Sequence, residues 1–495
     1  MIKMKTYISM KKIIKTKLKE VVGLGLTIAL ITFGCVDLDE NPIDFPAPDN
    51  FYQTESQIVS GLAGAMDPLY QQWGNYSYGW GSFHDDANGN SNLAFTGGHG
   101  NGFWRIHYAA IANLNNVIQA LIDDNLGPTV PQQTKDELMA QAKFLRGFNY
   151  FSLVRLYGDC PIITEETDLV NDVIERQPIR DVYTLIISDL QTALGDLPES
   201  WDPSFAPGRP TKDAARGFLA KVYLTMASAP LKDATQAANA RDMALAIINN
   251  DVHSLIPDVH DVFKIENKLG PENIFAFNAT SDDNSTPPQI WLPGSMAFGW
   301  NDFGPERTWA ERYPMQPRKE AYMILEDWDG NPGEEVSWRG SPPVRKFVYN
   351  DRETMERLTS TANIPLLRYA DVLLMFAEAE NMVNGGPTQA AVDAVNQIIN
   401  RANADAVNPD HPLVTTAMSQ ADFDAAVIQE RNLELFFEYD RWYDLIRKEI
   451  LCDVWPERED IEANCDQNDY LWPIPQADLR LNENMTQNPG YATGE

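Results

Sequence analysis

Apolar residues along most of this chain recur at steps of three and four, the spacing of one face of an α-helix. The clearest case is the stretch 430–448, which begins ERNLELFFEYDRW. Leu433, Phe436, Tyr439 and Trp442 follow this period, and the apolar side chains between them widen the face. A face this wide predicts a helix that lies against several others rather than on the surface.

The same stretch carries a row of carboxylates. Glu430, Glu434 and Glu438 are four residues apart and share one face of a continuous helix. Glycoside hydrolases need two carboxylates on opposite sides of a substrate bond, whereas these three point the same way. We therefore interpret them as carboxylates that pair with Arg side chains and lock the helix to its neighbours.

The helical period predicts a mainly α fold. The predicted helices cover 55–70, 105–123, 137–157, 181–197, 212–228, 235–250, 364–384, 388–401 and 420–448. Thr211 follows a proline and is the expected N-cap of its helix. Helices of this length with short joints predict antiparallel pairs stacked as a solenoid, although no strict 34-residue tetratricopeptide signature is present.

The segment 71–102 breaks the period with a run dense in Gly, Asn and aromatic residues. Loops this long are usually functional. A sugar ring stacks its apolar face on Trp or Tyr, while Asn, Asp and His satisfy its hydroxyl groups. The candidate ligand residues here are Trp73, Tyr76, Tyr78, Trp80, His84, Asp85 and Asn101. The alternative is that these rings only fix the loop to the body.

A second irregular segment, 255–358, is rich in Pro and Gly and predicts an insertion that covers the helical body. It is the second source of aromatic side chains, and we expect Trp291, Trp300 and Trp309 to contribute to a ligand surface. Trp328 and Trp338 belong to the same segment.

The run DWDGNPGEE in this insertion resembles a calcium loop because Asp327, Asp329 and Asn331 alternate. Pro332 stands where an EF-hand needs Gly, and no Glu follows at the required position. We therefore predict neither a metal nor another cofactor.

The N-terminus has the parts of an export signal. Residues 1–34 join a Lys-rich start to a short apolar run that ends at Gly34, directly before Cys35. A small residue before Cys in this position predicts lipoprotein cleavage and acylation of Cys35. We expect residues 35–53 to form a tether and residues 54–495 to form a single domain. No stretch after Cys35 is apolar enough to span a membrane.

The chain has 495 residues and a formal net charge of -32. Such an acidic protein does not bind nucleic acid by neutralising phosphates, and it repels polyanions unless a local basic patch overrides its charge. The charge therefore favours a neutral ligand.

The cysteines indicate one disulfide and no metal site. Cys452 and Cys465 bracket a short acidic loop, and export makes a bond between them plausible. Cys160 is expected to be a buried free thiol. No Cys or His spacing fits zinc.

Six stretches between Cys35 and Tyr491 together resemble the SusD/RagB family of outer-membrane nutrient-binding lipoproteins of Bacteroidetes. They are CVDLDENP with DNFYQTE, AQAKFLRGFNYFSLVRLYGDCPII, GRPTKDAARGFLAKVYL, PLLRYADVLLMFAEAEN, ERNLELFFEYDRWYDLIR and LWPIPQADLRLNENMTQNPGY. Gly147 departs from the family pattern, which usually has Ala there.

This resemblance implies a helical fold of four tetratricopeptide-like helix pairs that support an irregular, ligand-facing half. It implies an outer-membrane lipoprotein that faces the cell exterior, covers a SusC-like TonB-dependent transporter and delivers glycans to it without chemistry. It carries over no ligand residue, so the site prediction rests on the aromatic segments alone.

Two other functions remain open: a receptor for peptides in the same kind of transporter complex, and a glycoside hydrolase. Stacking aromatics with few cationic groups near them favour a neutral glycan. A β-glucan such as laminarin is the first choice of ligand and an α-glucan the second.

Overall fold

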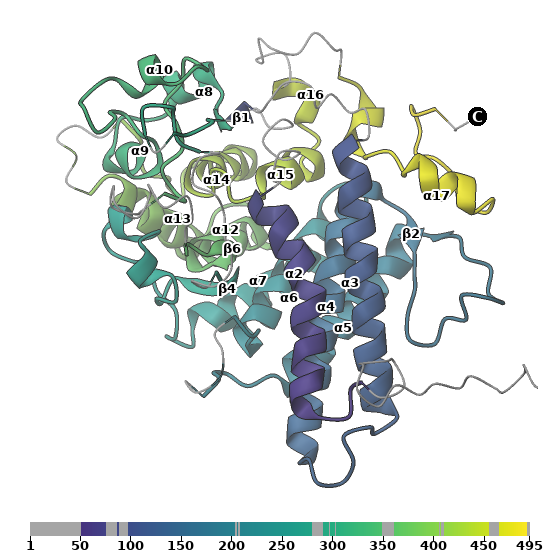
Figure 1. The fold of residues 1–495 in the computed structure, drawn as a ribbon. Helices are drawn as coiled ribbons and strands as arrows, with labels where there is room; N and C mark the ends of the chain where they lie inside the picture. Colours follow the sequence, from purple (N-terminus) through teal and green to yellow (C-terminus); the bar gives the residue numbers. More distant parts are fainter. Residues whose placement is uncertain are drawn as a thin grey trace, which may run out of the picture. The chain divides into compact units, whose positions relative to one another are not determined.

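Long helices make up most of the part of the chain that the structure describes, which confirms the predicted mainly α fold (Figure 1). This computed structural model describes residues 51–75, 87–88, 98–202, 205, 208–279, 291–296, 298–301, 303–348, 361–404, 406, 410–454 and 465–492, without the side chains of 71–75, 87–88 and 98–101. The predicted signal peptide, Cys35 and most of the tether lie outside these residues. From Tyr52 onward the chain forms one compact unit.

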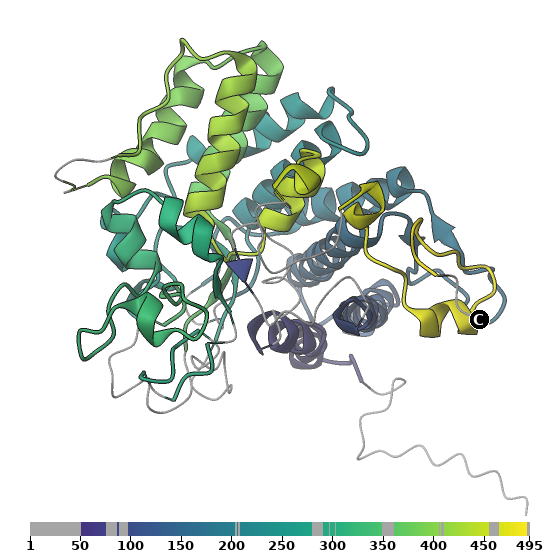
Figure 2. The same ribbon diagram turned by 90° about the horizontal axis from the view of Figure 1, so that it is seen from above.

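Consecutive helices pack against each other as four successive pairs (Figures 1 and 2). The pairs are α2 (Glu55–Asn75) with α3 (Gly98–Ile122), α4 (Gln132–Tyr157) with α5 (Ile179–Asp196), α6 (Lys212–Ala227) with α7 (Gln236–Ile248), and α12 (Tyr369–Asn384) with α13 (Gln389–Ala402). Each pair also contacts the next. The likeness of these pairs to tetratricopeptide units stays a prediction.

Local sequence signals fix several helix ends. The side chain of Thr211 accepts a hydrogen bond from the backbone N–H of Ala214, which confirms the predicted N-cap of α6. Thr388 caps α13 in the same way. Gly385 ends α12 with φ +67°, a left-handed conformation that glycine adopts without a steric penalty.

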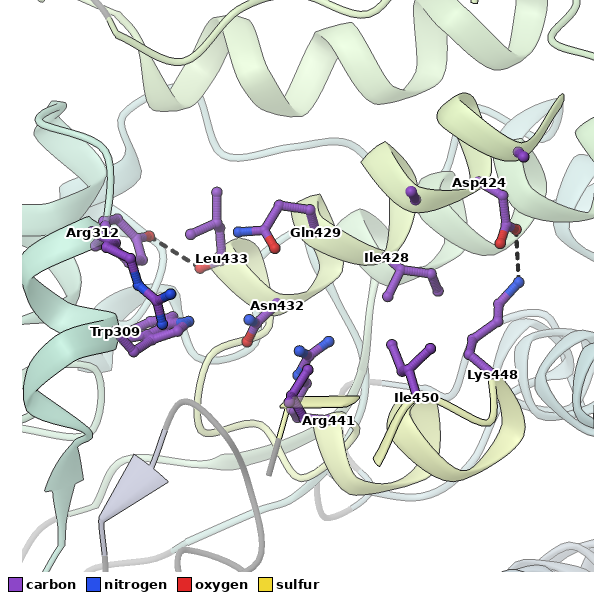
Figure 3. Close-up of a pocket in the computed structure, with 14 residues that line it drawn as sticks. Trp309, Arg312, Asp424, Ile428, Gln429, Asn432, Leu433, Arg441, Lys448 and Ile450 are labelled. Atoms are coloured by element: carbon purple, nitrogen blue, oxygen red, sulfur yellow. Dashed lines mark hydrogen bonds and ion pairs between the residues drawn. The ribbon is translucent and has the colours of Figure 1, made fainter. Parts of the chain in front are cut away.

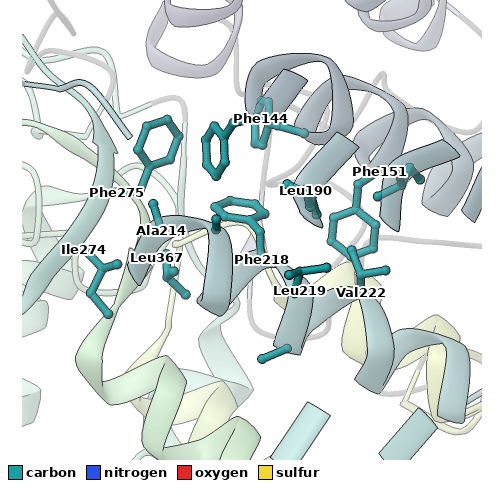
Figure 4. Close-up of a cluster of buried hydrophobic side chains, with 14 of the residues drawn as sticks. Phe144, Phe151, Leu190, Ala214, Phe218, Leu219, Val222, Ile274, Phe275 and Leu367 are labelled. Carbon is teal, nitrogen blue, oxygen red and sulfur yellow. The ribbon is translucent and has the colours of Figure 1, made fainter. Parts of the chain in front are cut away.

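The main hydrophobic core lies where α4, α6 and strand β4 (Asn273–Phe277) meet (Figure 4). Phe144, Phe218 and Phe275 pack edge to face there, with ring centroids 4.9 to 6.0 Å apart. Gly217 lets Leu367 lie directly against α6, because an added Cβ would stand 2.2 Å from Leu367 Cδ2. The strand that contains Leu367 is therefore part of this core.

Among the described residues, the strands form three antiparallel pairs. They are β1 (Ala87–Asn88) with β5 (Gly304–Pro305), β2 (Cys160–Pro161) with β3 (Arg176–Gln177), and β4 with β6 (Ile364–Arg368). The prediction of helix from residue 364 is therefore wrong, and α12 begins at Tyr369. Pro365 explains the difference, since the residue before a proline is pushed from helical toward extended backbone.

The predicted helix 420–448 is broken. Helix α14 (Gln420–Glu434) ends before a turn, and α15 (Arg441–Arg447) begins after it. Phe437 and Tyr439 have φ of +59° and +71° in this turn. Phe436 and Phe437 pack with side chains of the insertion in a second hydrophobic cluster, while Tyr439 and Trp442 pack into the main core. In a straight helix Phe436 and Tyr439 would lie on one face and enter the same cluster. They enter different clusters, so the chain turns between them.

Glu430, Glu434 and Glu438 nonetheless pair with Arg side chains, as predicted: Arg318 with Glu430 and Glu434, and Arg368 with Glu438. Arg318 Nη1 donates to Glu430 at 2.6 Å and to Glu434 at 2.9 Å. Lys346 donates to Glu438 at 2.7 Å. We call the whole buried network the ionic seam: Glu272, Arg318, Lys346, Arg368, Arg401, Glu430, Glu434 and Glu438. It ties side chains of the insertion to side chains of the helical body.

The C-terminal segment lies across the body as an irregular strap, with one short helix, α17 (Gln476–Leu481). Its Trp472 donates from the backbone N–H to the carbonyl of Leu156 at 2.7 Å. Asn488 Nδ2 donates to the carbonyls of Tyr157 and Trp472 at 3.0 and 2.7 Å. The strap therefore covers the C-terminal end of α4.

The predicted disulfide and the predicted buried thiol are both confirmed. Cys452, in α16 (Leu451–Val454), forms a disulfide with Cys465. Cys160 is a buried free thiol, and burial raises the pKa of this thiol to about 12.

Candidate functional site

Three large aromatic side chains are exposed on two neighbouring turns of the insertion. Phe298 is 83% exposed, Trp300 55% and Trp338 63%. We call these three residues the aromatic surface. Apolar side chains that are exposed together, unlike single ones, mark a site of interaction.

The backbone of the first turn is fixed by close packing. Gly299 separates Phe298 from Trp300, and a Cβ on this glycine would stand 1.9 Å from the carbonyl oxygen of Leu292. Phe298 and Asn301 have φ of +54° and +49°. Only glycine fits between the two rings, so this turn presents them in one defined backbone geometry.

Three hydrogen bonds fasten the second turn to the first. Trp338 Nε1 donates to the carbonyl of Trp300 at 2.9 Å, and Arg339 Nε donates to the carbonyl of Asn301 at 3.0 Å. Ser337 Oγ donates to Asn301 Oδ1 at 2.6 Å. The aromatic surface is therefore organised before any ligand arrives, which lowers the entropic cost of binding.

The guanidinium of Arg339 lies over the ring of Trp338, 4.1 Å from its centroid. This cation–π contact covers part of the indole and holds its orientation. Because Trp338 is still 63% exposed, most of its apolar surface remains accessible to a flat ligand.

The two aromatic-rich segments meet where β1 pairs with β5, and Figure 1 shows β1 beside the ribbon of the insertion. Strand β1, two residues after Asp85 in the sequence, pairs with β5, four residues after Trp300. Ser341 Oγ, from beyond the second turn, donates to the carbonyl of Pro305 in β5 at 2.8 Å. The structure thus brings parts of 71–102 and 255–358 to one place.

Two of the predicted tryptophans are not displayed. Trp291 is 1% exposed and packs against Phe303, Phe347 and Phe437 in the second hydrophobic cluster. The prediction of a surface ring at Trp291 is wrong, because this ring forms the core of the insertion.

Trp309 is 6% exposed, and its ring stacks on Phe436 with centroids 4.7 Å apart. It does not belong to the aromatic surface. Its exposed remainder lines a separate cavity. The prediction of a displayed ring at Trp309 is therefore also wrong.

The predicted loop 71–102 is shorter than expected at both ends. Helix α2 continues to Asn75 and contains Trp73, and α3 begins at Gly98 and contains Asn101. Apart from Gly74, residues 71–75 are all tolerated in a helix, so α2 continues through them. The side chains of Trp73 and Asn101, and the residues Tyr76, Tyr78, Trp80, His84 and Asp85, lie outside the part of the chain that is described.

Trp300 is the one predicted insertion residue that is exposed, and sequence reasoning did not select Phe298 or Trp338. A local signal was available for both. Phe298 lies next to a glycine in the tripeptide Phe-Gly-Trp, and Trp338 lies two positions before one in Trp-Arg-Gly. Glycine marks turns, and turns expose the side chains next to it.

A cavity of about 540 Å³ opens between α8 (Arg307–Arg312), α14, α15 and α16 (Figure 3). Arg312 and Trp309 stand at one end, and the ion pair of Asp424 with Lys448 at the other. Burial raises the pKa of the Asp424 carboxyl, and the nearby negative charge of Glu378 adds to this effect.

Within the described residues no group of three or more His, Cys, Asp or Glu side chains is placed to hold a metal ion. Asp327, from the run that resembles a calcium loop, instead accepts hydrogen bonds from the backbone N–H groups of Asp329 and Asn331 at 2.9 Å. None of the described helices has the length and apolar character needed to cross a bilayer.

Comparison with known protein families gives two matches. Residues 291–491 match the profile of the SusD family. Residues 60–224 match a profile described as starch-binding associating with outer membrane.

Individual relatives extend over nearly the whole chain. A SusD-like protein of Formosa agariphila is 29% identical over 94% of this chain and 98% of its own length. The crystal structure of a SusD superfamily protein from Parabacteroides distasonis superposes with a TM-score of 0.76, at 23% identity over 88% of this chain and 99% of that one. A solved laminarin-binding SusD-like protein superposes with a TM-score of 0.71, at 22% identity over 88% and 100%. At 23% and 22% identity, the similarity to these two structures shows a shared fold only.

Proposed function

This chain belongs to the SusD/RagB family, and from this membership we propose that it is a cell-surface glycan-binding protein. It captures an oligosaccharide or polysaccharide on the aromatic surface and delivers it to a SusC-like TonB-dependent transporter. Acylated Cys35 anchors it to the outer membrane, facing the cell exterior. Binding takes place without chemistry.

The main support for this proposal is that the indole rings of Trp300 and Trp338 are both exposed and that a hydrogen bond from Trp338 Nε1 to the carbonyl of Trp300 holds the two turns together. A pyranose ring has an apolar face of C–H groups that packs on an indole, and two rings held by backbone contacts accept such a ligand without rearranging. Few rings take part, so we expect dissociation constants in the micromolar to millimolar range, about 4 to 8 kcal/mol.

A neutral β-glucan is the ligand we propose first, with an α-glucan second. The net charge of -32 disfavours capture of a polyanionic chain at long range. A related fold in a laminarin-binding protein supports a β-glucan as the first polymer to test.

The experiment is affinity electrophoresis of the mature protein, from the residue after Cys35, in gels that contain laminarin, starch, xylan, mannan or alginate. We expect retardation in one neutral glycan gel, and at least about tenfold weaker binding for Trp300→Ala and for Trp338→Ala. Leu481→Ala is the matched control, because Leu481 is 86% exposed on α17 and outside the aromatic surface.

Circular dichroism of each variant establishes that it is folded. Retardation that survives both Trp substitutions would contradict the aromatic surface as the site. Release of reducing ends from the retarding glycan would identify a glycoside hydrolase. Absence of retardation in every gel, together with binding of peptides, would favour the peptide receptor.

A further inference from the structure

A second cavity, of about 300 Å³, lies between the C-terminal end of α4, helix α15 and the strap. This volume is at the lower end of the range of small-molecule sites. Aliphatic side chains form one part of its wall, among them Val154, Ile179, Ile446 and Leu471. The cavity therefore has the room and the apolar surface for one small aliphatic group.

Three arginines line the cavity, and two of them use their donors within the protein. Arg176 donates from Nε, Nη1 and Nη2 to backbone carbonyls at 2.7 to 3.0 Å. Arg447 donates to the carboxylates of Glu378 and Asp444. Neither of these two guanidinium groups needs a ligand.

Arg155, the third arginine, is held in one orientation. Its guanidinium carbon lies 3.4 Å from the ring centroid of Tyr443 and 3.9 Å from that of Phe151, and its side chain is 7% exposed. Contacts with two aromatic rings fix the planar guanidinium before a ligand arrives, which lowers the entropic cost of binding.

Arg155 differs from the other two arginines in its hydrogen bonds. Its Nε donates to the carbonyl of Phe151 at 3.2 Å, whereas its Nη1 lies 3.9 Å from Asp440 Oδ1, an ion pair too long for a hydrogen bond. Within the described part of the chain Arg155 makes no other hydrogen bond, so its terminal N–H groups are available to an acceptor in the cavity. Because Asp440 is already its ionic partner, this acceptor can be neutral.

We propose that this cavity binds a neutral molecule with a branched aliphatic group next to a carbonyl, the chemistry of a leucine-like residue in a short peptide. The carbonyl oxygen accepts hydrogen bonds from the terminal N–H groups of Arg155. The aliphatic group packs on Val154, Ile446 and Leu471. A sugar fits this wall poorly, because hydroxyl groups against aliphatic side chains lose their hydrogen bonds to water without replacement.

Isothermal titration calorimetry with three neutral probes tests the proposal on the mature protein. N-acetyl-L-leucine amide has both the aliphatic group and the carbonyl, N-acetylglycine amide has the carbonyl without the aliphatic group, and D-glucose has neither. We expect the leucine probe to bind at least about tenfold more tightly than the other two, because burial of its isobutyl group is worth at least that factor. Equal affinities for the leucine and glycine probes, or for the leucine probe and glucose, would overturn the proposal, as would no binding of the leucine probe.

Arg155→Lys tests the hydrogen bond to the ligand. Lysine keeps the positive charge beside Asp440 but lacks the fork of terminal N–H groups, so the variant should bind the leucine probe at least about tenfold more weakly. Arg180→Lys, on the exposed face of α5, is the control with the same chemical change and should bind as the unaltered protein does.

Ile446→Trp tests the location. It fills the cavity from a partly exposed position on α15 and should abolish binding of the leucine probe. Ile122→Trp is its control, because Ile122 is 56% exposed on α3 and does not line the cavity. Circular dichroism establishes that each variant is folded. Full affinity for the leucine probe in both Arg155→Lys and Ile446→Trp would contradict the cavity as the site.

The outcome is independent of the proposed glycan function, because the cavity and the aromatic surface share no residue. Substitutions at Trp300 and Trp338 should abolish retardation in the glycan gel and leave binding of the leucine probe intact. Arg155→Lys should do the reverse.

Discussion

At the scale of single residues, His107 is a buried histidine whose pKa lies far from its usual value. It is fully buried, its Nδ1 lies 2.7 Å from Asn149 Oδ1, and its ring centroid is 4.2 Å from that of Phe103. Burial disfavours the charged imidazolium and lowers the pKa of His107 to about 3, although the hydrogen bond with Asn149 opposes the shift.

This shift predicts a pH dependence of stability. Below pH about 6.5 the unfolded chain binds a proton at His107 that the folded protein rejects, so the free energy of unfolding falls as the pH falls. The slope from this one group reaches about 1.4 kcal/mol per pH unit. Urea unfolding between pH 7 and pH 4.5 measures it.

His107→Gln is the control, because it keeps a side chain of similar reach and every other titrating group. The difference between the two stability curves should therefore show the loss that begins near pH 6.5. Curves that stay parallel over this interval would show that His107 does not cause the pH dependence.

The sequence predicts some individual residues well and others poorly. The disulfide partners and the exposure of Trp300 follow from local context. The burial of Trp291 does not, because Trp suits both a core and a binding surface. Its environment depends on Phe303, Phe347 and Phe437, and Phe437 comes from a segment more than 140 residues away.

At the scale of elements, two helical glycines differ in what surrounds them. In α6, a Cβ at Gly217 would meet Leu367 Cδ2 at 2.2 Å, whereas at Gly195 in α5 there is nothing within 4 Å. The same substitution therefore has opposite consequences at the two positions.

Gly195→Ala should raise the free energy of unfolding by about 0.4 to 1 kcal/mol, because alanine restricts the unfolded chain and favours helix. Gly217→Ala should lower it by about 1 to 3 kcal/mol, because α6 and β6 would have to separate. Urea titration of both variants measures the two effects. A stabilising Gly217→Ala would mean that Leu367 moves aside at little cost.

The periodicity of apolar residues predicted where helices are present, but it did not predict where a helix is broken. The six helices from 55 to 250 appear in the structure because their apolar period runs uninterrupted. The break between α14 and α15 leaves the period almost unchanged, since Phe436, Tyr439 and Trp442 keep helical spacing in the sequence. Only the existence of two separate hydrophobic clusters makes a turn necessary there.

At the scale of the whole molecule, the ionic seam connects the insertion to the helical body. Glu434 lies near its centre and is fully buried. It accepts hydrogen bonds from Arg318, Arg368 and Arg401 at 2.8 to 3.0 Å. These cations hold the pKa of the Glu434 carboxyl far below its usual range, against the opposing effect of burial.

Glu434→Gln should lower the free energy of unfolding by about 3 to 5 kcal/mol, because a neutral amide leaves the buried cations of the seam with one carboxylate too few. Glu449→Gln is the control: Glu449 pairs with Lys232 on the surface, and its loss should change stability by less than about 1 kcal/mol. Urea unfolding at pH 7 compares the two. Equal stability of the Glu434 and Glu449 variants would contradict a structural role of the seam.

The pairing of β1 with β5 is the feature of the whole molecule that sequence reasoning had no means to find. Each strand has two residues, and more than 200 residues separate them. A ladder this short has no periodic signal of its own, so the meeting of the two aromatic segments was not predictable.

The ionic seam also has a consequence for protein engineering. The insertion, which displays the aromatic surface, is fastened by the ionic seam, by the pairing of β4 with β6, and by Trp291 and Trp309, which pack on Phe437 and Phe436. A chimera that transplants an insertion from one relative onto the body of another therefore needs to match all three kinds of contact. A graft that keeps the seam carboxylates together with Phe436 and Phe437 should display a new aromatic surface on an unchanged scaffold.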